Sequence, residues 1–186
     1  FQLPQYYQQR RLLPVSVKTR IGYEHSTVST WIPTLLDTKP AVISLHGRTL
    51  KQMYTGSANW EEIAKATKIV HQTSETLILG NGDIDSVGSA KEKIATSGVD
   101  GVLVGRATFG NPWVLVKLVE WRNSELKSEN FSNQSQQMPS KKPDQTQPTI
   151  QNKIKLAIEH CQAYETFLPE DNFLPMRKHL AWYIKS

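Results

Sequence analysis

Four short apolar segments, each ending in glycine or polar residues, constrain the fold of this chain more than any other feature. The clearest is in residues 76–84, where the apolar run Thr76-Leu-Ile-Leu79 is followed at once by Gly80-Asn-Gly-Asp83. A short apolar run bounded by turn residues is typical of a strand buried in a parallel sheet. Asp85 or Ser86 can then cap a helix, so the stretch predicts a strand, a glycine turn and a helix start whose backbone N–H groups suit an anion.

The same pattern recurs along the chain. Residues 14–18, 41–45 and 99–104 are predicted strands, and the helices between them are predicted over 27–36, over 60–70 with Asn59 and Glu62 as a capping box, and up to Gly98 as a left-handed cap. Strand-helix units about 25 to 35 residues apart favour a parallel α/β sheet. Because four units are too few for an eight-stranded barrel, we expect the C-terminal half of a TIM (β/α)8 barrel, cut from a longer chain.

Three domains are predicted. Residues 1–122 would form the half barrel, and residues 123–152, rich in Ser, Gln, Asn, Lys and Pro, would be a flexible insertion or linker. Residues 153–186 keep helical spacing of apolar side chains and are expected to begin a small helical domain.

Composition limits the classes of function. The one cysteine, Cys161, excludes an internal disulfide and a cysteine-rich zinc site, and its place on an apolar helix face predicts a core residue. No metal is expected. No membrane span and no secretion signal are expected either, so the protein is predicted to be soluble and cytoplasmic. The net charge of +5 fits a polyanionic partner such as nucleic acid, and it fits a basic surface without a partner equally well.

Polar residues end every predicted strand, and the carboxyl ends of parallel strands are where such sheets bind ligands. The candidates are Lys18, His46, Arg48, Asn81, Gly82, Asp83, Gly105 and Arg106. A guanidinium beside a glycine turn, as at Arg106, matches phosphate geometry. Lys18 could instead be a solvated strand end, His46 a structural histidine and Asp83 a turn cap. Trp60, Trp113 and Trp182 are expected to serve packing.

Several segments taken together resemble the tRNA-dihydrouridine synthase family, from about Leu13 to the C-terminus except for the polar insertion. They are Ser16-Val-Lys-Thr-Arg-Ile-Gly22, Leu45-His-Gly-Arg-Thr49, Gly80-Asn-Gly-Asp-Ile84, Gly98-Val-Asp-Gly-Val-Leu-Val-Gly-Arg106, Gly110-Asn-Pro-Trp113 and Met176-Arg-Lys-His-Leu-Ala-Trp-Tyr183. Their number and order make the resemblance specific.

The resemblance implies an enzyme that uses FMN, with NADPH or NADH as electron donor, to reduce uridine in tRNA to 5,6-dihydrouridine. It implies that Lys18 and His46 lie beside the flavin ring, and that Arg48 supports the loop facing the substrate. It further implies that the ribityl chain and phosphate are held by Asn81, Gly82, Asp83, Gly105 and Arg106, and that Arg177 and Lys178 grip the tRNA backbone. The complete enzyme is expected to be monomeric.

One departure from the family is large. The family's catalytic cysteine has no counterpart here and is expected upstream, so no catalytic residue is assigned in this chain, which alone is expected to be inactive. Two alternatives stay open: another FMN-dependent barrel oxidoreductase acting on a small molecule, and a non-catalytic tRNA-binding remnant.

Overall fold

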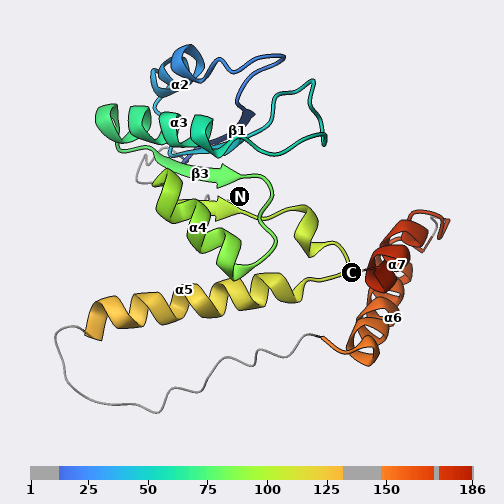
Figure 1. Ribbon diagram of the computed structural model, residues 1–186. Coiled ribbons are helices and arrows are strands. Elements are labelled where there is room, and N and C mark those ends of the chain that lie inside the picture. The colour runs from blue at the N-terminus through green and yellow to red at the C-terminus, as the bar shows by residue number, and fades with distance from the viewer. Residues whose placement is uncertain (1–12, 132–147, 170–171, 186) are drawn as a thin grey trace, which may run out of the picture. The chain divides into compact units, whose positions relative to one another are not determined.

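A computed structural model describes residues 13–131, 148–169 and 172–185, with the backbone alone for 126–131 (Figure 1). Its one sheet has four strands, all parallel, in the sequential order β1-β2-β3-β4. The strands are β1 (Ser16–Arg20), β2 (Val42–His46), β3 (Leu77–Asn81) and β4 (Gly101–Leu103), and the helices that connect them are α2 (Val28–Leu36), α3 (Trp60–Thr73) and α4 (Val87–Ser97). This repeat is that of half a (β/α)8 barrel, and the predicted fold class is confirmed.

One face of the sheet holds the core. Ile43 and Ile78 are aligned on β2 and β3 and are fully buried, as is Ile63 of α3. They lie on the face toward α3, because a Cβ built on Gly80, two residues beyond Ile78, would meet the Trp60 ring at 2.5 Å. Leu77, on the alternate face, is 51% exposed. The helix-covered face therefore carries most of the buried apolar area, and Trp60 is a packing residue as predicted.

The first strand ends two residues later than the sequence predicts. The prediction stopped at Lys18, the first charged residue, whereas pairing continues to Arg20, which lies opposite His46 of β2. The parallel ladder extends for as long as β2 offers partners, and polar side chains do not end it. This extension brings Arg20 into line with His46.

The cap of α3 is confirmed in part. The Asn59 side chain accepts a hydrogen bond from the Glu62 N–H at 3.1 Å, as predicted. The Glu62 carboxylate accepts instead from the Lys65 ammonium and the Ser26 hydroxyl, and these two bonds hold the pKa of Glu62 below its usual value. Gly98, with φ of 71°, is the left-handed cap that follows α4.

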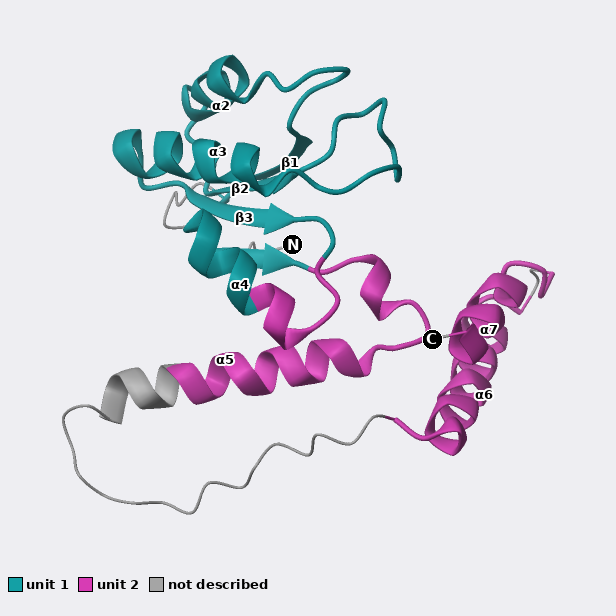
Figure 2. Ribbon diagram, viewed as in Figure 1, with its two compact units in different colours: residues 1–83, 91–103 teal, residues 84–90, 104–186 magenta. Residues whose placement is uncertain are grey.

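The chain divides into two compact units, residues 1–83 with 91–103, and residues 84–90 with 104–186 (Figure 2). The second unit contains the short 3-10 helix η1 (Arg106–Thr108) and helices α5 (Trp113–Phe131), α6 (Ile150–Phe167) and α7 (Met176–Lys185). Thr149 and Asn152 form a reciprocal capping box at the start of α6. None of the helices in the described residues is long and apolar enough to cross a membrane.

The predicted linker, residues 123–152, falls mostly on residues 132–147, which lie outside the described part of the chain. Residues 123–131 continue α5, and residues 150–152 begin α6. The proposed division into three domains stays a prediction.

Candidate functional site

The parallel register brings three of the predicted site residues, Lys18, His46 and Asn81, together at the carboxyl end of the sheet. Arg20, which was not predicted, lies beside His46 and Asn81 on successive strands. Lys18 lies two residues before Arg20 on the same face. The Lys18 ammonium donates a hydrogen bond to the Asn81 side-chain oxygen at 3.3 Å. We call Lys18, Arg20, His46 and Asn81 the polar row.

Asn81 is fixed from two sides. Its side-chain nitrogen donates to the Leu103 carbonyl of β4 at 2.8 Å, while its side-chain oxygen accepts from Lys18. The amide thereby ties β1 to β4 across the end of β3. Partial burial, and then the charge of Arg20, lower the pKa of Lys18 from its ordinary value.

The imidazole of His46 is held neutral. Burial first, and then the positive charges of Arg20, Lys18 and Arg48, lower the pKa of His46 to about 4, although Asp83 opposes the shift. At neutral pH a neutral ring carries one N–H donor and one acceptor nitrogen. The row therefore combines positive charge with a donor that adds no charge of its own.

The turn at Gly82 and Asp83, which follows β3, is pressed against His46; the strand runs on through Gly80 and Asn81, where the sequence predicted a turn. Gly82 has φ of 126°, and a Cβ built on it would lie 2.6 Å from the Ala58 Cβ and 3.2 Å from the His46 ring. The Trp60 indole donates to the Gly82 carbonyl at 3.0 Å and so supports the turn from the core side. The sequence predicted a glycine requirement here, but it carried no signal that Trp60 would support the turn.

The Arg48 side chain is buried and forms its hydrogen bonds with the loop that follows β2 and with Asp83. It is 2% exposed, and its guanidinium donates to the carbonyls of Thr55 and Gly56 and, at 2.8 Å, to both carboxylate oxygens of Asp83. Asp83 also accepts from the Ala58 N–H at 2.7 Å. The arrangement favours the supporting role expected of Arg48 over direct contact with a substrate.

The two loops that follow β1 and β2 are joined through their backbones. Leu50 N–H donates to the Gly22 carbonyl and Lys51 N–H to the Tyr23 carbonyl, each at 2.9 Å. Arg20 adds a side-chain bond to the Thr49 carbonyl at 2.8 Å. Arg20 thus braces the loops beside the polar row, a role that its position within a strand did not reveal in the sequence.

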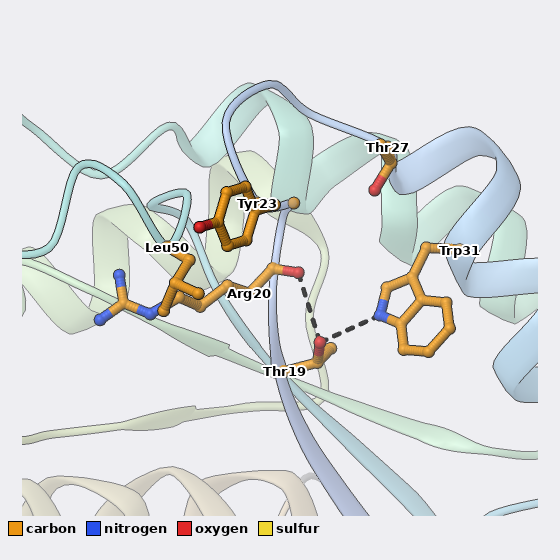
Figure 3. Close-up of a pocket in the computed structure, with 7 residues that line it drawn as sticks. Thr19, Arg20, Tyr23, Thr27, Trp31 and Leu50 are labelled. Atoms are coloured by element: carbon orange, nitrogen blue, oxygen red, sulfur yellow. Dashed lines mark hydrogen bonds between the residues drawn. The ribbon is translucent and has the colours of Figure 1, made fainter.

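A pocket of about 340 Å³ lies next to these loops (Figure 3). Trp31 forms part of its lining, and the Trp31 indole N–H donates a hydrogen bond to the Thr19 hydroxyl at 3.0 Å. Thr19 alternates with Lys18 along β1, so the pocket opens on the other face of the strand from the polar row. Apart from Arg20 it contains no residue of the row, and its lining is Thr19, Arg20, Gly22, Tyr23, Thr27, Trp31 and Leu50.

The remaining predicted residues belong to the second unit. Gly105 and Arg106 are exposed just before and at the start of η1, and a Cβ built on Gly105 would meet no atom within 4 Å. Arg177 and Lys178 are exposed in the first turn of α7. Their union with the polar row in one site stays a prediction.

Each unit, taken by itself, offers groups that suit one part of a flavin nucleotide. In the first unit, an ammonium, a neutral imidazole and an oriented amide can satisfy a polar ring edge. In the second unit, open space beside a glycine that precedes an arginine suits a phosphate. Among the described residues, no group of three or more His, Cys, Asp or Glu side chains could hold a metal ion.

Comparison with known proteins agrees with the motifs. A family model described as dihydrouridine synthase (Dus) matches residues 6–186. A probable tRNA-dihydrouridine synthase of Rickettsia bellii is 31% identical over 92% of this chain and 47% of its own length. Probable synthases of Synechocystis and Mycobacterium tuberculosis are 31% and 33% identical over 94% and 92% of this chain, and over 44% and 40% of their own lengths.

The chain thus spans about half the length of the curated relatives that it matches. The family model covers nearly all of the sequence, including the strands of the polar row, Gly105-Arg106 and α7. The chain belongs to the dihydrouridine synthase family.

Proposed function

We propose that the protein containing this sequence uses FMN to reduce uridine in tRNA to 5,6-dihydrouridine. Membership of the dihydrouridine synthase family supports the reaction, and relatives named as tRNA-dihydrouridine synthases support the substrate. The structural observation that carries the proposal is the polar row, in which Lys18, His46 and Asn81 meet at the end of the sheet where parallel α/β folds bind ligands.

FMN, when bound, would supply a hydride to the uracil ring, with NADPH or NADH as electron donor. Lys18 and His46 are proposed to lie beside the flavin ring. Lys18 would place positive charge near a ring that becomes electron-rich, and the neutral His46 would contribute a hydrogen bond without further charge. The residues proposed to hold the ribityl chain and phosphate are Asn81, Gly82, Asp83, Gly105 and Arg106.

The tRNA would contact two parts of the chain. Arg48 is proposed to hold residues 49–58 in place for the target uridine, which must be turned out of the RNA to be reduced. Arg177 and Lys178, both exposed on α7, are proposed to bind backbone phosphates. The uracil would also need a proton donor, and no residue of this chain is proposed for that role. Cys161 is only partly buried on α6, not in the core as the sequence predicted.

The test is to map dihydrouridine in tRNA from a strain that lacks the gene. Loss at one or more positions is expected, with recovery when the natural gene is restored. A gene carrying Lys18→Met should fail to restore dihydrouridine, and one carrying Lys68→Met, at an exposed site on α3, should succeed. Unchanged dihydrouridine in the deletion strain would refute the proposed substrate.

A further inference from the structure

Two motifs of the chain meet in the second unit; the first has no role in the function proposed above, and the second has one only through Arg177 and Lys178. The first is Gly110-Asn-Pro-Trp113, and the second is α7, which carries Met176-Arg-Lys-His-Leu-Ala-Trp-Tyr183. The Phe109 ring, next to the first motif, stacks on the Trp182 ring of the second, with centroids 4.2 Å apart and planes 12° apart.

Gly110 lets the two backbones approach closely. It is buried, its φ is 69°, and a Cβ built on it would lie 2.3 Å from the Trp182 carbonyl oxygen and 2.7 Å from the Tyr183 nitrogen. Any other residue would need a different backbone conformation and would collide with the main chain of α7. The contact of residues 109–110 with α7 therefore depends on both a ring stack and a missing side chain.

Trp182 is itself held in place by α6 and α7. The His179 ring packs edge-on against it at 4.8 Å, and the His160 ring of α6 packs edge-on against His179 at 5.1 Å. The Tyr183 hydroxyl lies 3.3 Å from His160 Nδ1. Aromatic contacts of this kind fix a side chain more narrowly than aliphatic packing does, so Trp182 presents a rigid surface to Phe109.

Phe109 and Gly110, which contact α7, directly follow residues 105–108, where Gly105 and Arg106 are proposed to hold the phosphate; we call residues 105–108 the phosphate loop. Phe109 N–H donates to the Arg106 carbonyl at 3.0 Å, and Thr108 N–H donates to the Gly105 carbonyl at 3.0 Å. Asn111 N–H donates to the Thr108 carbonyl at 3.1 Å. Residues 105–111 are thus one hydrogen-bonded turn, with Gly105-Arg106 at one end and the Trp182 contact at the other.

We propose that Trp182 is a positioning residue for Arg106. By clamping Phe109 and Gly110 it fixes the turn that sets the Arg106 backbone, so that the guanidinium meets a ligand phosphate without first being ordered. The inference rests on the proposed function, because it takes the phosphate of FMN as the ligand of Arg106. It also means that α7, which carries Arg177 and Lys178, is packed directly against the turn that holds Arg106.

The test compares FMN with riboflavin, which lacks the phosphate, in the natural protein that contains this sequence. Trp182→Ala should weaken FMN binding roughly tenfold, about the loss of one well-placed ionic hydrogen bond, and should leave riboflavin binding nearly unchanged. Trp182→Phe keeps a stacking ring and should retain FMN affinity, as should Ile184→Ala, which changes an exposed α7 residue. Equal losses for FMN and riboflavin, or no loss for either, would overturn the inference.

Hydrogen exchange without any flavin separates this inference from the proposed function. Trp182→Ala should speed exchange at the Phe109 and Asn111 amides, while Ile184→Ala should not. Unchanged protection of both amides in Trp182→Ala would refute the clamp. If the amides respond but the natural protein binds neither FMN nor riboflavin, the clamp stands as a structural fact and the proposed cofactor, with the positioning role toward its phosphate, fails.

Discussion

The chain contains two Gly-Arg pairs that follow strands of the same sheet, and they have opposite surroundings. Gly47-Arg48 comes after β2, and Arg48 is 2% exposed with its guanidinium bound to Asp83 and to two loop carbonyls. Gly105-Arg106 comes after β4, where both residues are exposed. The same dipeptide at equivalent positions therefore gives a buried brace in one unit and an accessible cation in the other.

The difference comes from residues distant in sequence. Arg48 is covered because Asp83, 35 residues later, turns back through a left-handed backbone (φ of 52°) to accept two of its hydrogen bonds. A buried guanidinium is stable only when such partners are present. Arg106 begins a short 3-10 helix on the surface, where water can solvate it. Partners and burial, and not the motif, decide which arginine can meet a ligand.

Removing each guanidinium should have very unequal effects on folding. Arg48→Met removes the donor of two loop carbonyls and the charged partner of Asp83, so the free energy of unfolding should fall by about 3 kcal/mol. Arg106→Met, at an exposed site, should change it by less than about 0.5 kcal/mol. Urea unfolding followed by tryptophan fluorescence measures both. Equal effects would contradict the division of roles.

The two glycines of the proposed phosphate-binding turns sharpen the same contrast. Gly82→Ala puts a Cβ 2.6 Å from Ala58 at a positive φ, so we expect a loss of about 2 kcal/mol or more. Gly105→Ala meets open space, and its loss should be less than half of that. The same urea titration compares them, and a larger cost at Gly105 would show that the second turn is the more constrained.

The pH dependence of stability reports on the polar row, and its effect should be smaller than that of Arg48→Met or Gly82→Ala. The pKa of His46 falls from 6.5 to about 4 on folding, so below pH 6.5 the unfolded chain binds a proton that the folded chain does not. Stability should therefore decrease as the pH falls from 6.5 to about 4 and then level off. Because the ring is only partly buried, the loss should be of the order of 1 kcal/mol.

His46→Gln provides the control for that titration. It should flatten the slope between pH 6.5 and 4, while other titrating groups, including His179, whose pKa burial also lowers, remain in place. An NMR titration of the His46 ring gives the same information residue by residue, and a midpoint near 6.5 would contradict the neutral, partly buried imidazole. Arg48→Met should move the midpoint upward, since Arg48 is one of the charges that lower it.

Much of the sheet could be predicted from local sequence. Apolar runs that end in glycine or polar residues located the strands along the chain. Parallel pairing of these strands then implied that Lys18, His46 and Asn81 lie at one end of the sheet. The burial of Arg48 could not be predicted, because it depends on Asp83 and on the loop carbonyls of Thr55 and Gly56. These contacts are set by tertiary folding and leave no periodic signal.

The contact between Phe109 and Trp182 was equally invisible in the sequence. Both residues lie in segments that resemble the family, but nothing in their spacing pairs a turn after β4 with a helix more than 60 residues further on. Trp182 was correctly expected to be a packing residue. The identity of its partner, and with it the route to Arg106, required the structure.

The most direct test of the account is the flavin content of the natural protein and of its Arg106→Ala variant. We predict that the natural protein is purified with FMN, identified by its absorbance and by release on denaturation, and that Arg106→Ala loses most of it while remaining folded. Full FMN occupancy in the folded Arg106→Ala variant would contradict the assignment of the exposed arginine to the phosphate. A natural protein that binds no flavin at all would contradict the flavin site itself.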